Sequence, residues 1–416
     1  MCADHDRSVV RIRAIENLIF RSARVIELFG ATGRCFQIQR IACTKAPARG
    51  RRMYAWTMSS IAGQHMNFGS DNQSGVSPRI LDALVAASSG TAAPYGNDTW
   101  TQQAEQAIAR VFDHDVKAFF VATGTAANCL ALSALAQPWN AILCHAQAHL
   151  ISDESTAPEF FTGGARLLPI ATDSGKITPT ALRATLKRLP DARPHSVKPS
   201  ALSLAQATEN GLVYTPAELK ALSEVAHAHG LHVHMDGARF ANAVAALGCT
   251  PAEMTVHAGI DVLSFGASKD GALAAEAVVF FKPALAEGFD YRRKRAGQLV
   301  SKGRLFGAQF NAWLQDDHWL ELAGQANHAA QVLAATLQAH ADIRLAWPVQ
   351  ANEVFVVMPK ALLERLLAAG VQCYDWYPDS LPASMPLGAD EVPVRFVTAW
   401  STSDQQLDEF AAVLGR

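Results

Sequence analysis

Short apolar runs alternate with amphipathic segments through most of the chain after about residue 66. The apolar runs predict buried strands at residues 118–122, 141–144, 231–235, 261–265 and 276–281. The segments between them predict helices, including one at 129–136 that ends before Pro138 and one that runs from a capping box at Thr215 and Glu218 to Gly230. Continuous apolar strands between helices are typical of a mostly parallel sheet covered on both faces, so the sequence predicts an α/β fold.

The pattern changes near residue 310. A long helix is predicted at 310–338, followed by strands near 354–358 and 394–398 and a last helix that begins at Ser403, where Gln406 completes a second capping box. The sequence therefore predicts a large domain at 58–309 and a smaller α+β domain at 310–416.

The first residues of the chain differ from the rest, because they are basic and carry few acids. This segment lacks the serine richness of an organelle transit peptide and the apolar core of a secretory signal. We expect residues 1–57 to be an extension outside the functional fold, either disordered or translated from a start codon placed too early. The alternative starts are Met53, Met58 and Met66.

Composition narrows the possible functions. The 416 residues have a formal net charge of −2 and are half hydrophobic, so a large core is available and binding to nucleic acid or an anionic membrane is not indicated. No apolar run approaches the roughly 20 residues that span a bilayer. The seven cysteines are scattered without a CxxC pair, which favours a reducing, cytoplasmic compartment.

Lys269 and Asp236 form the most informative pair in the chain. Lys269 follows an apolar strand and is flanked by Gly266, Ala267, Ser268 and Gly271, small residues that allow a cofactor to approach the backbone closely. Asp236 ends the preceding strand, in the sequence His-Val-His-Met-Asp-Gly. A lysine that condenses with an aldehyde and a carboxylate that keeps a pyridine nitrogen protonated are what a pyridoxal phosphate enzyme requires. An ordinary loop lysine and a turn aspartate are the simpler alternatives.

Three further features fit this hypothesis. Gly124 and Thr125 lie between a predicted strand and the start of a helix, where free N–H groups favour a phosphate, although many such turns carry these residues. Arg239 follows Asp236 by three residues and could bind a substrate carboxylate in a bidentate manner. Arg395, in a strand of the small domain, could reach the same carboxylate or simply be a strand-edge arginine with a solvated head.

Histidines allow a rival interpretation. His149 could stack on a cofactor ring and transfer protons, whereas His145 is expected to be a hydrogen-bonded histidine at the end of a strand. The spacing of His232, His234 and Asp236 instead resembles the ligands of a metal-dependent hydrolase, to which Cys144, His145 and His149 could add. That alternative leaves Lys269 and the phosphate cradle without a role, so no metal is predicted.

The order of these motifs resembles that of the low-specificity L-threonine aldolases, in the bacterial branch that includes phenylserine aldolase and within the beta-eliminating lyases. The resemblance covers about residue 67 to the C-terminus. It is carried by SDNQSG at 70–75, YGND at 95–98, GTAAN at 124–128, CHAQAH at 144–149, DESTAPEFF at 153–161, QATENG at 206–211, HMDGARFAN at 234–242, SFGASKDG at 264–271, RRKR at 292–295 and VRFV at 394–397.

The resemblance implies a pyridoxal phosphate-dependent enzyme of fold type I, the aspartate-aminotransferase architecture, with a large mixed-sheet domain and a small α+β domain. It implies a homotetramer, or a homodimer, that cleaves L-threonine or L-allo-threonine to glycine and acetaldehyde, as a lyase of amino acid metabolism. It also assigns the roles of individual residues. They are Lys269 as the Schiff-base lysine, Asp236 as the pyridinium partner, His149 as the stacking residue, Gly124 and Thr125 at the phosphate, Arg239 in the cofactor pocket, and Ser70, Arg239 and Arg395 at the substrate carboxylate.

One departure from the family bears on the mechanism. Some members carry a second active-site histidine in the segment that corresponds to residues 206–211, where this chain has Glu209. The group that accepts the proton of the substrate hydroxyl is therefore open, with His149 as one candidate. The same scaffold could also host β-elimination or transamination, or bind the cofactor without catalysis.

Overall fold

The computed structural model describes residues 28–29, 35–36, 66–190 and 193–415, in two units that divide between residues 61 and 62. In the first unit, β1 (Leu28–Phe29) pairs antiparallel with β2 (Cys35–Phe36). The rest of the extension predicted at 1–57 lies outside the described residues. Everything below concerns the second unit.

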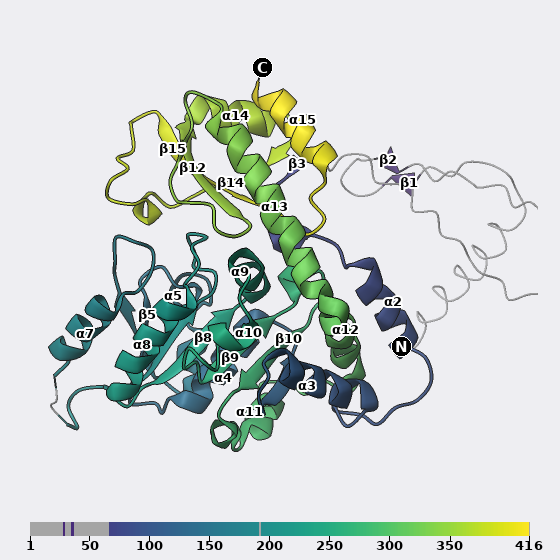
Figure 1. The fold of residues 1–416 in the computed structure, drawn as a ribbon, viewed down its shortest axis with the longest axis vertical. Helices are drawn as coiled ribbons and strands as arrows, with labels where there is room; N and C mark the ends of the chain where they lie inside the picture. Colours follow the sequence, from purple (N-terminus) through teal and green to yellow (C-terminus); the bar gives the residue numbers. More distant parts are fainter. Residues whose placement is uncertain (1–27, 30–34, 37–65, 191–192, 416) are drawn as a thin grey trace, which may run out of the picture. The chain divides into compact units, whose positions relative to one another are not determined.

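A seven-stranded mixed sheet forms the centre of this unit (Figure 1). Its order is β4 (Lys117–Val121), β10 (Glu276–Phe280), β9 (Val262–Gly266), β8 (His232–Gly237), β7 (Lys198–Ala205), β5 (Asn140–His145) and β6 (Arg166–Ile170). The strands from β9 to β6 are parallel, and β10 is antiparallel to both of its neighbours. Residues 267–275 join β9 to β10 and are too few for the crossover that a parallel pair needs. All five strands predicted from apolar runs are confirmed.

Helices precede, connect and follow these strands along the chain. They are α2 (Pro78–Ala87), α3 (Thr99–Val111), α4 (Gly124–Leu135), α5 (His149–Ser152), α6 (Ala157–Thr162), α7 (Pro179–Arg188), α8 (Pro216–Ala228), α9 (Phe240–Leu247), α10 (Pro251–Met254), α11 (Phe289–Arg295) and α12 (Arg304–Leu314). The capping box predicted at Thr215 and Glu218 is confirmed at α8. α4 begins at Gly124 rather than at residue 129, so its first turn directly follows β4 and Thr123 caps it.

A second, four-stranded antiparallel sheet lies in the C-terminal part, in the order β11 (Arg344–Leu345), β12 (Glu353–Pro359), β15 (Glu391–Val397) and β14 (Tyr374–Asp375). Helices α13 (His318–Gln338), α14 (Lys360–Ala368) and α15 (Asp404–Leu414) accompany it. The capping box at Ser403 and Gln406 is confirmed at α15. Figure 1 shows α13 extending from α12, beside the large sheet, to the small sheet.

The single helix predicted at 310–338 is wrong. α12 ends at Leu314, and α13 begins at His318 after a short 3-10 turn. Asp316 and Asp317 both have positive φ, 55° and 54°, in the left-handed region that aspartate tolerates better than most residues. Hydrophobic periodicity continues across this break, which is why the pattern alone does not reveal it.

The two sheets have separate apolar cores, and each core includes residues from a segment outside its own sheet. Phe310 and Trp313 pack with the large sheet, whereas Met66 and Phe68 pack with the small one, where β3 (Met66–Asn67) pairs with β13 (Val371–Gln372). The domain boundary between residues 309 and 310 stays a prediction. In the described part of the chain, no helix combines the length and apolar character needed to cross a membrane.

Candidate active site

Lys269, Asp236 and Gly124 line one cavity of about 340 Å³. β8 and β9 are parallel neighbours, so their carboxyl ends meet at the same edge of the sheet, where Asp236 and the Lys269 turn lie. Gly124 reaches this edge from β4 on the first turn of α4. Parallel pairing thus brings together three residues that sequence reasoning took from separate motifs.

The turn that carries Lys269 is held by its neighbours. Its ends are closed by the backbone bond from Ala267 N to Ala275 O (3.1 Å), and Ser268 Oγ accepts from Ala275 N (3.1 Å). Gly271 adopts a φ of +90°, which favours glycine. Within the described residues, the Lys269 amine has no hydrogen-bond or ion-pair partner. A rigid turn therefore presents a free amine to the cavity.

The carboxylate of Asp236 is fixed at both oxygens. Oδ1 accepts from Ala238 N (3.0 Å), and Oδ2 accepts from Asn128 Nδ2 (2.8 Å). The side chain is half-buried and still faces the cavity. Asp236 is therefore held in one orientation, with oxygen lone pairs left to receive a further donor.

His149 belongs to the same polar chain. Its Nδ1 lies 2.8 Å from Glu154 Oε1, which also accepts from Asn128 Nδ2 (2.9 Å). Asn128 therefore links the Glu154 carboxylate to that of Asp236. The hydrogen bond with Glu154, more than any other contact, raises the pKa of His149. Glu154 and Asn128 lie within motifs that carry the family resemblance, but their separation in the sequence gave no sign that they join His149 and Asp236 through hydrogen bonds.

The first turn of α4 forms an anion cradle. Thr123 caps the helix, and its Oγ1 accepts from Ala126 N (3.1 Å). The earlier N–H groups, of Gly124 and Thr125, have no carbonyl partner inside the helix. A Cβ built on Gly124 would meet nothing within 4 Å, so the space beside this turn is open. Both residues line the cavity with Lys269.

A second cavity of about 800 Å³ adjoins the first and shares Lys269, His149 and Arg239 with it. It also contains Ser70 and Arg395, so the structure brings the three predicted carboxylate ligands to one space. The Arg395 guanidinium lies 4.0 Å from the centre of the Trp376 ring, and burial lowers its pKa. The sequence gave no signal for Trp376.

Arg239 is held by a carboxylate that the sequence reasoning missed. Its Nε donates to Asp71 Oδ2 (2.7 Å) and its Nη2 to Asp71 Oδ1 (3.0 Å), while Nη1 lies 3.4 Å from Glu353 Oε1. Asp71 is 1% exposed. Burial alone would raise the pKa of Asp71, but the charges of Arg239 and Lys269 and the hydrogen bonds from Arg239 and Asn352 together lower that pKa to about 2. Asp71 therefore occupies the Nε–Nη2 edge of the guanidinium, so the bidentate contact with a substrate carboxylate that the sequence suggested is not available at that edge.

The metal-hydrolase alternative is not assembled within the described part of the chain. His232 lies 3.8 Å from Asp261, whereas His234 lies between the hydroxyls of Ser203 (2.9 Å) and Ser264 (3.0 Å). Neither imidazole joins Asp236 in a cluster close enough to share an ion. The expectation for His145 is confirmed, since its Nε2 lies 3.1 Å from Thr172 Oγ1.

Comparison with known proteins identifies the family. The beta-eliminating lyase family matches residues 67–361. The low specificity L-threonine aldolase of a Pseudomonas species is 43% identical over 352 residues, which cover 85% of this chain and 98% of that protein. The chain belongs to the beta-eliminating lyase family. The family resemblance and the enzyme class predicted from the sequence are confirmed with it.

Solved structures agree with this beta-eliminating lyase assignment. The threonine aldolase of Leishmania major superposes with a TM-score of 0.78 at 28% identity, over 84% of this chain and 99% of that protein. Serine palmitoyltransferase of Sphingomonas wittichii superposes with a TM-score of 0.62 at 17% identity, over 99% of this chain and 97% of that protein, a likeness of fold alone. The predicted fold class is confirmed.

Proposed function

We propose that this lyase uses pyridoxal phosphate to cleave L-threonine, L-allo-threonine or another L-3-hydroxy-amino acid such as phenylserine into glycine and an aldehyde. One observation carries the proposal. A lysine amine without a polar partner in the described chain lies where two cavities meet, with the half-buried carboxylate of Asp236 in the wall of one of them.

The residues of the smaller cavity fit this cofactor. The open space beside Gly124, at a helix N-terminus, suits a phosphate. The remaining acceptor capacity of Asp236 suits a protonated ring nitrogen, and a charge-assisted bond of this kind is about twice as strong as a neutral one. His149 lines the same cavity and would face the ring, and Lys269 would hold the aldehyde carbon.

The larger cavity suits the amino acid. Bound pyridoxal phosphate supplies the electron sink for cleavage of the Cα–Cβ bond. Arg239 and Arg395 would fix the substrate carboxylate together with Ser70, and two guanidinium groups suit a planar anion. Holding the carboxylate at one end of the site orients the Cα–Cβ bond relative to the ring and so selects which bond breaks.

Borohydride trapping tests the proposal. Reduction of the purified protein should fix the cofactor on the peptide that contains Lys269, and mass spectrometry should find the adduct there. Lys269→Ala should carry no adduct and should release no aldehyde from L-threonine, whereas Lys187→Ala, an exposed lysine on α7, should match the wild type. Full aldehyde release by Lys269→Ala would refute the assignment. Assay of ammonia beside aldehyde separates cleavage from elimination.

We further propose a cytoplasmic homotetramer. Leu273, in the turn after Lys269, lines the cofactor cavity yet is 65% exposed, and Tyr291 on α11 is 79% exposed, so apolar surface is available for subunit contacts. Among residues 66–190 and 193–415 four cysteines are free, three of them buried, which suits a reducing compartment. Light scattering of the purified protein measures the subunit number directly.

A further inference from the structure

Glu209 lies at the centre of the site without a role in the chemistry described so far. It lines both cavities, together with Lys269, His149 and Arg239. Its Oε1 accepts from His149 N at 3.1 Å, which leaves Oε2 for another partner. A carboxylate in the wall between the cofactor cavity and the substrate cavity is placed to contact a group of the bound amino acid.

The charges around Glu209 are mixed. Burial is the largest influence and raises its pKa, and the negative charges of Asp236 and Glu353 act in the same direction. His149 opposes them, and Arg239 and Arg395 also interact with it electrostatically. The pKa of Glu209 is raised to about 7. The other ionisable groups that line these cavities are His145, Asp153, Asp173, Lys269, Glu276, Tyr377 and Asp379.

The loop that carries Glu209, residues 206–214, is closed at its base by one side chain. Gln206 Nε2 donates to Tyr214 O (2.8 Å), and its Oε1 accepts from Tyr214 N (2.9 Å). Inside the loop, Thr208 N donates to Leu212 O (2.8 Å) and Gly211 N donates to Thr208 O (2.9 Å). These bonds leave Glu209 at the tip of a short, cross-linked turn.

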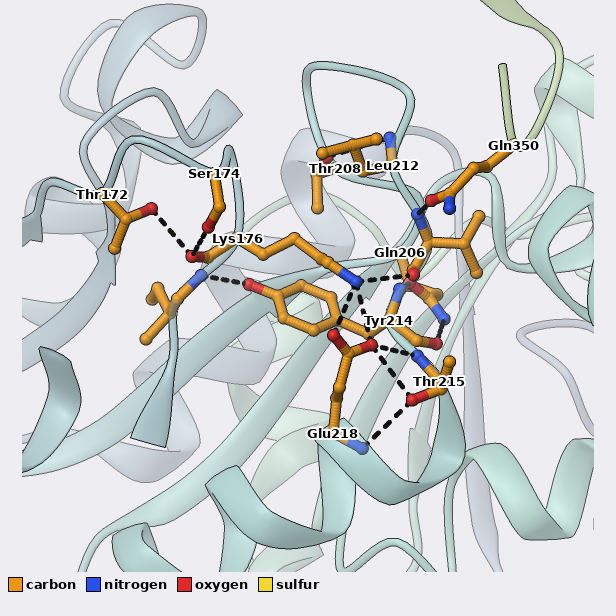
Figure 2. Close-up of polar contacts among 12 residues, drawn as sticks. Thr172, Ser174, Lys176, Gln206, Thr208, Leu212, Tyr214, Thr215, Glu218 and Gln350 are labelled. Atoms are coloured by element: carbon orange, nitrogen blue, oxygen red, sulfur yellow. Dashed lines mark hydrogen bonds and ion pairs between the residues drawn. The ribbon is translucent and has the colours of Figure 1, made fainter. Parts of the chain in front are cut away.

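A second set of contacts fixes the closed end of the 206–214 loop to the surrounding elements (Figure 2). The Tyr214 hydroxyl accepts from Ile177 N (2.6 Å). The Lys176 ammonium donates to Val213 O (3.0 Å) and to both oxygens of Glu218 (2.8 Å each). Val213 N donates to Gln350 Oε1 (2.8 Å), which ties the loop to the segment before β12. The position of Glu209 is therefore set by the fold before any ligand arrives.

His149 is less suited to accept a proton. Its Nδ1 is held by Glu154, and this bond raises the pKa of the imidazole above its usual value. A charged imidazole can donate a hydrogen bond or stack on a ring, but it has no free lone pair. Glu209 has an uncommitted carboxylate oxygen on the same wall.

We propose that Glu209 accepts the proton of the substrate's β-hydroxyl during cleavage. This inference rests on the proposed function. The proton passes from the hydroxyl to Glu209, and the O–H electron pair becomes the second carbon–oxygen bond of the aldehyde. The Cα–Cβ electron pair stays with Cα, where bound pyridoxal phosphate would supply the electron sink. Cα takes one proton from solvent and Glu209 releases one proton to solvent, so the proton count balances when glycine leaves.

Glu209→Gln tests this role, because glutamine keeps the shape and can still accept from His149 N. The fall in kcat for L-threonine cleavage should be on the order of 10²–10⁴-fold, the range that general bases contribute. Glycine lacks the β-hydroxyl, so the glycine concentration at the midpoint of the change in the visible spectrum should equal the wild-type value. Glu287→Gln, an exposed glutamate, is the matched control and should leave both unchanged.

Two pH experiments separate Glu209 from His149. The kcat profile of the wild type should fall on the acid side of about pH 7, and Glu209→Gln should lose that limb. Independently of turnover, cofactor-free protein labelled with [δ-¹³C]glutamate should show a carboxyl resonance with a midpoint near 7 that is missing in Glu209→Gln. Glu209→Asp, which keeps the carboxylate, should retain the limb at a reduced rate.

Each result has a defined meaning. A near-normal kcat in Glu209→Gln, or an acid limb that survives unchanged in it, overturns the role of Glu209 while aldehyde release by the wild type upholds the proposed function. A wild type that binds glycine but releases no aldehyde overturns the proposed function and this inference together. If Glu209→Gln does not fold, two measurements remain: the acid limb of the kcat profile in Glu209→Asp and the carboxyl resonance of the wild type. The proposal is refuted if both are absent.

Discussion

The pair formed by Asp71 and Arg239 is expected to be the main electrostatic support of the substrate cavity. Asp71 lies in a 3-10 turn before α2, Arg239 follows β8, and Asn352, just before β12, also donates to Asp71 Oδ2 (3.0 Å). Asp71 and Arg239 are 1% and 8% exposed, respectively. Replacing Asp71 with Asn would keep the volume but leave a buried guanidinium without its bidentate partner.

The magnitude follows from this burial. Removing one partner of a buried ion pair typically destabilises a protein by about 3–5 kcal/mol. Glu353 lies 3.4 Å from Arg239 Nη1 and remains as a partner, so we expect Asp71→Asn to lose about 3 kcal/mol. With about 2.1 cal/mol/K of unfolding entropy per residue over residues 62–416, that loss lowers Tm by about 4 °C.

Calorimetry and urea unfolding of the cofactor-free protein measure this loss at one fixed subunit concentration, since assembly shifts apparent stability. Asp82→Asn, an exposed position on α2, is the matched control and should change Tm by less than 1 °C. The wild type should also lose the contribution of Asp71 as pH falls from about 4 to about 2, because the folded pKa lies below the unfolded value. A loss below 1 kcal/mol in Asp71→Asn would refute the role assigned to the pair.

Two further outcomes are expected. Asp236→Ala should reduce the rate of aldehyde release by orders of magnitude, because each ~1.4 kcal/mol of lost transition-state stabilisation is tenfold; a rate within threefold of wild type would remove its role as ring-nitrogen partner. Burial lowers the pKa of His234 in the folded protein, so as pH falls the imidazole binds a proton in the unfolded chain before it does in the folded one. The free energy of unfolding should therefore decline as pH falls below about 6.5. Urea unfolding at pH 7.5 and 5.0 should show a smaller decline in His234→Gln, and an equal decline in both proteins would contradict this origin.

The sequence alone determined five of the seven strands of the large sheet, the two capping boxes and the identity of the chemical groups, whereas β6 and β7 were not predicted. Apolar runs mark the buried strands because a parallel sheet covered on both faces needs apolar side chains throughout, and Thr215 and Ser403 mark helix starts because their hydroxyls satisfy local N–H groups. Lys269 and Asp236 stood out because small neighbours and strand ends leave a local signature.

Tertiary structure decided which of these groups meet and in what state. The break between α12 and α13 depends on two backbone conformations at Asp316 and Asp317 that periodicity does not encode. The partnership of Arg239 with Asp71 joins residues 168 positions apart, and the raised pKa of Glu209 arises from burial and from charges on other elements. Electrostatic interactions and burial depend on distances through space, whereas local sequence signals extend over a few residues, so the chain specified the chemical groups and only the fold specified their environment.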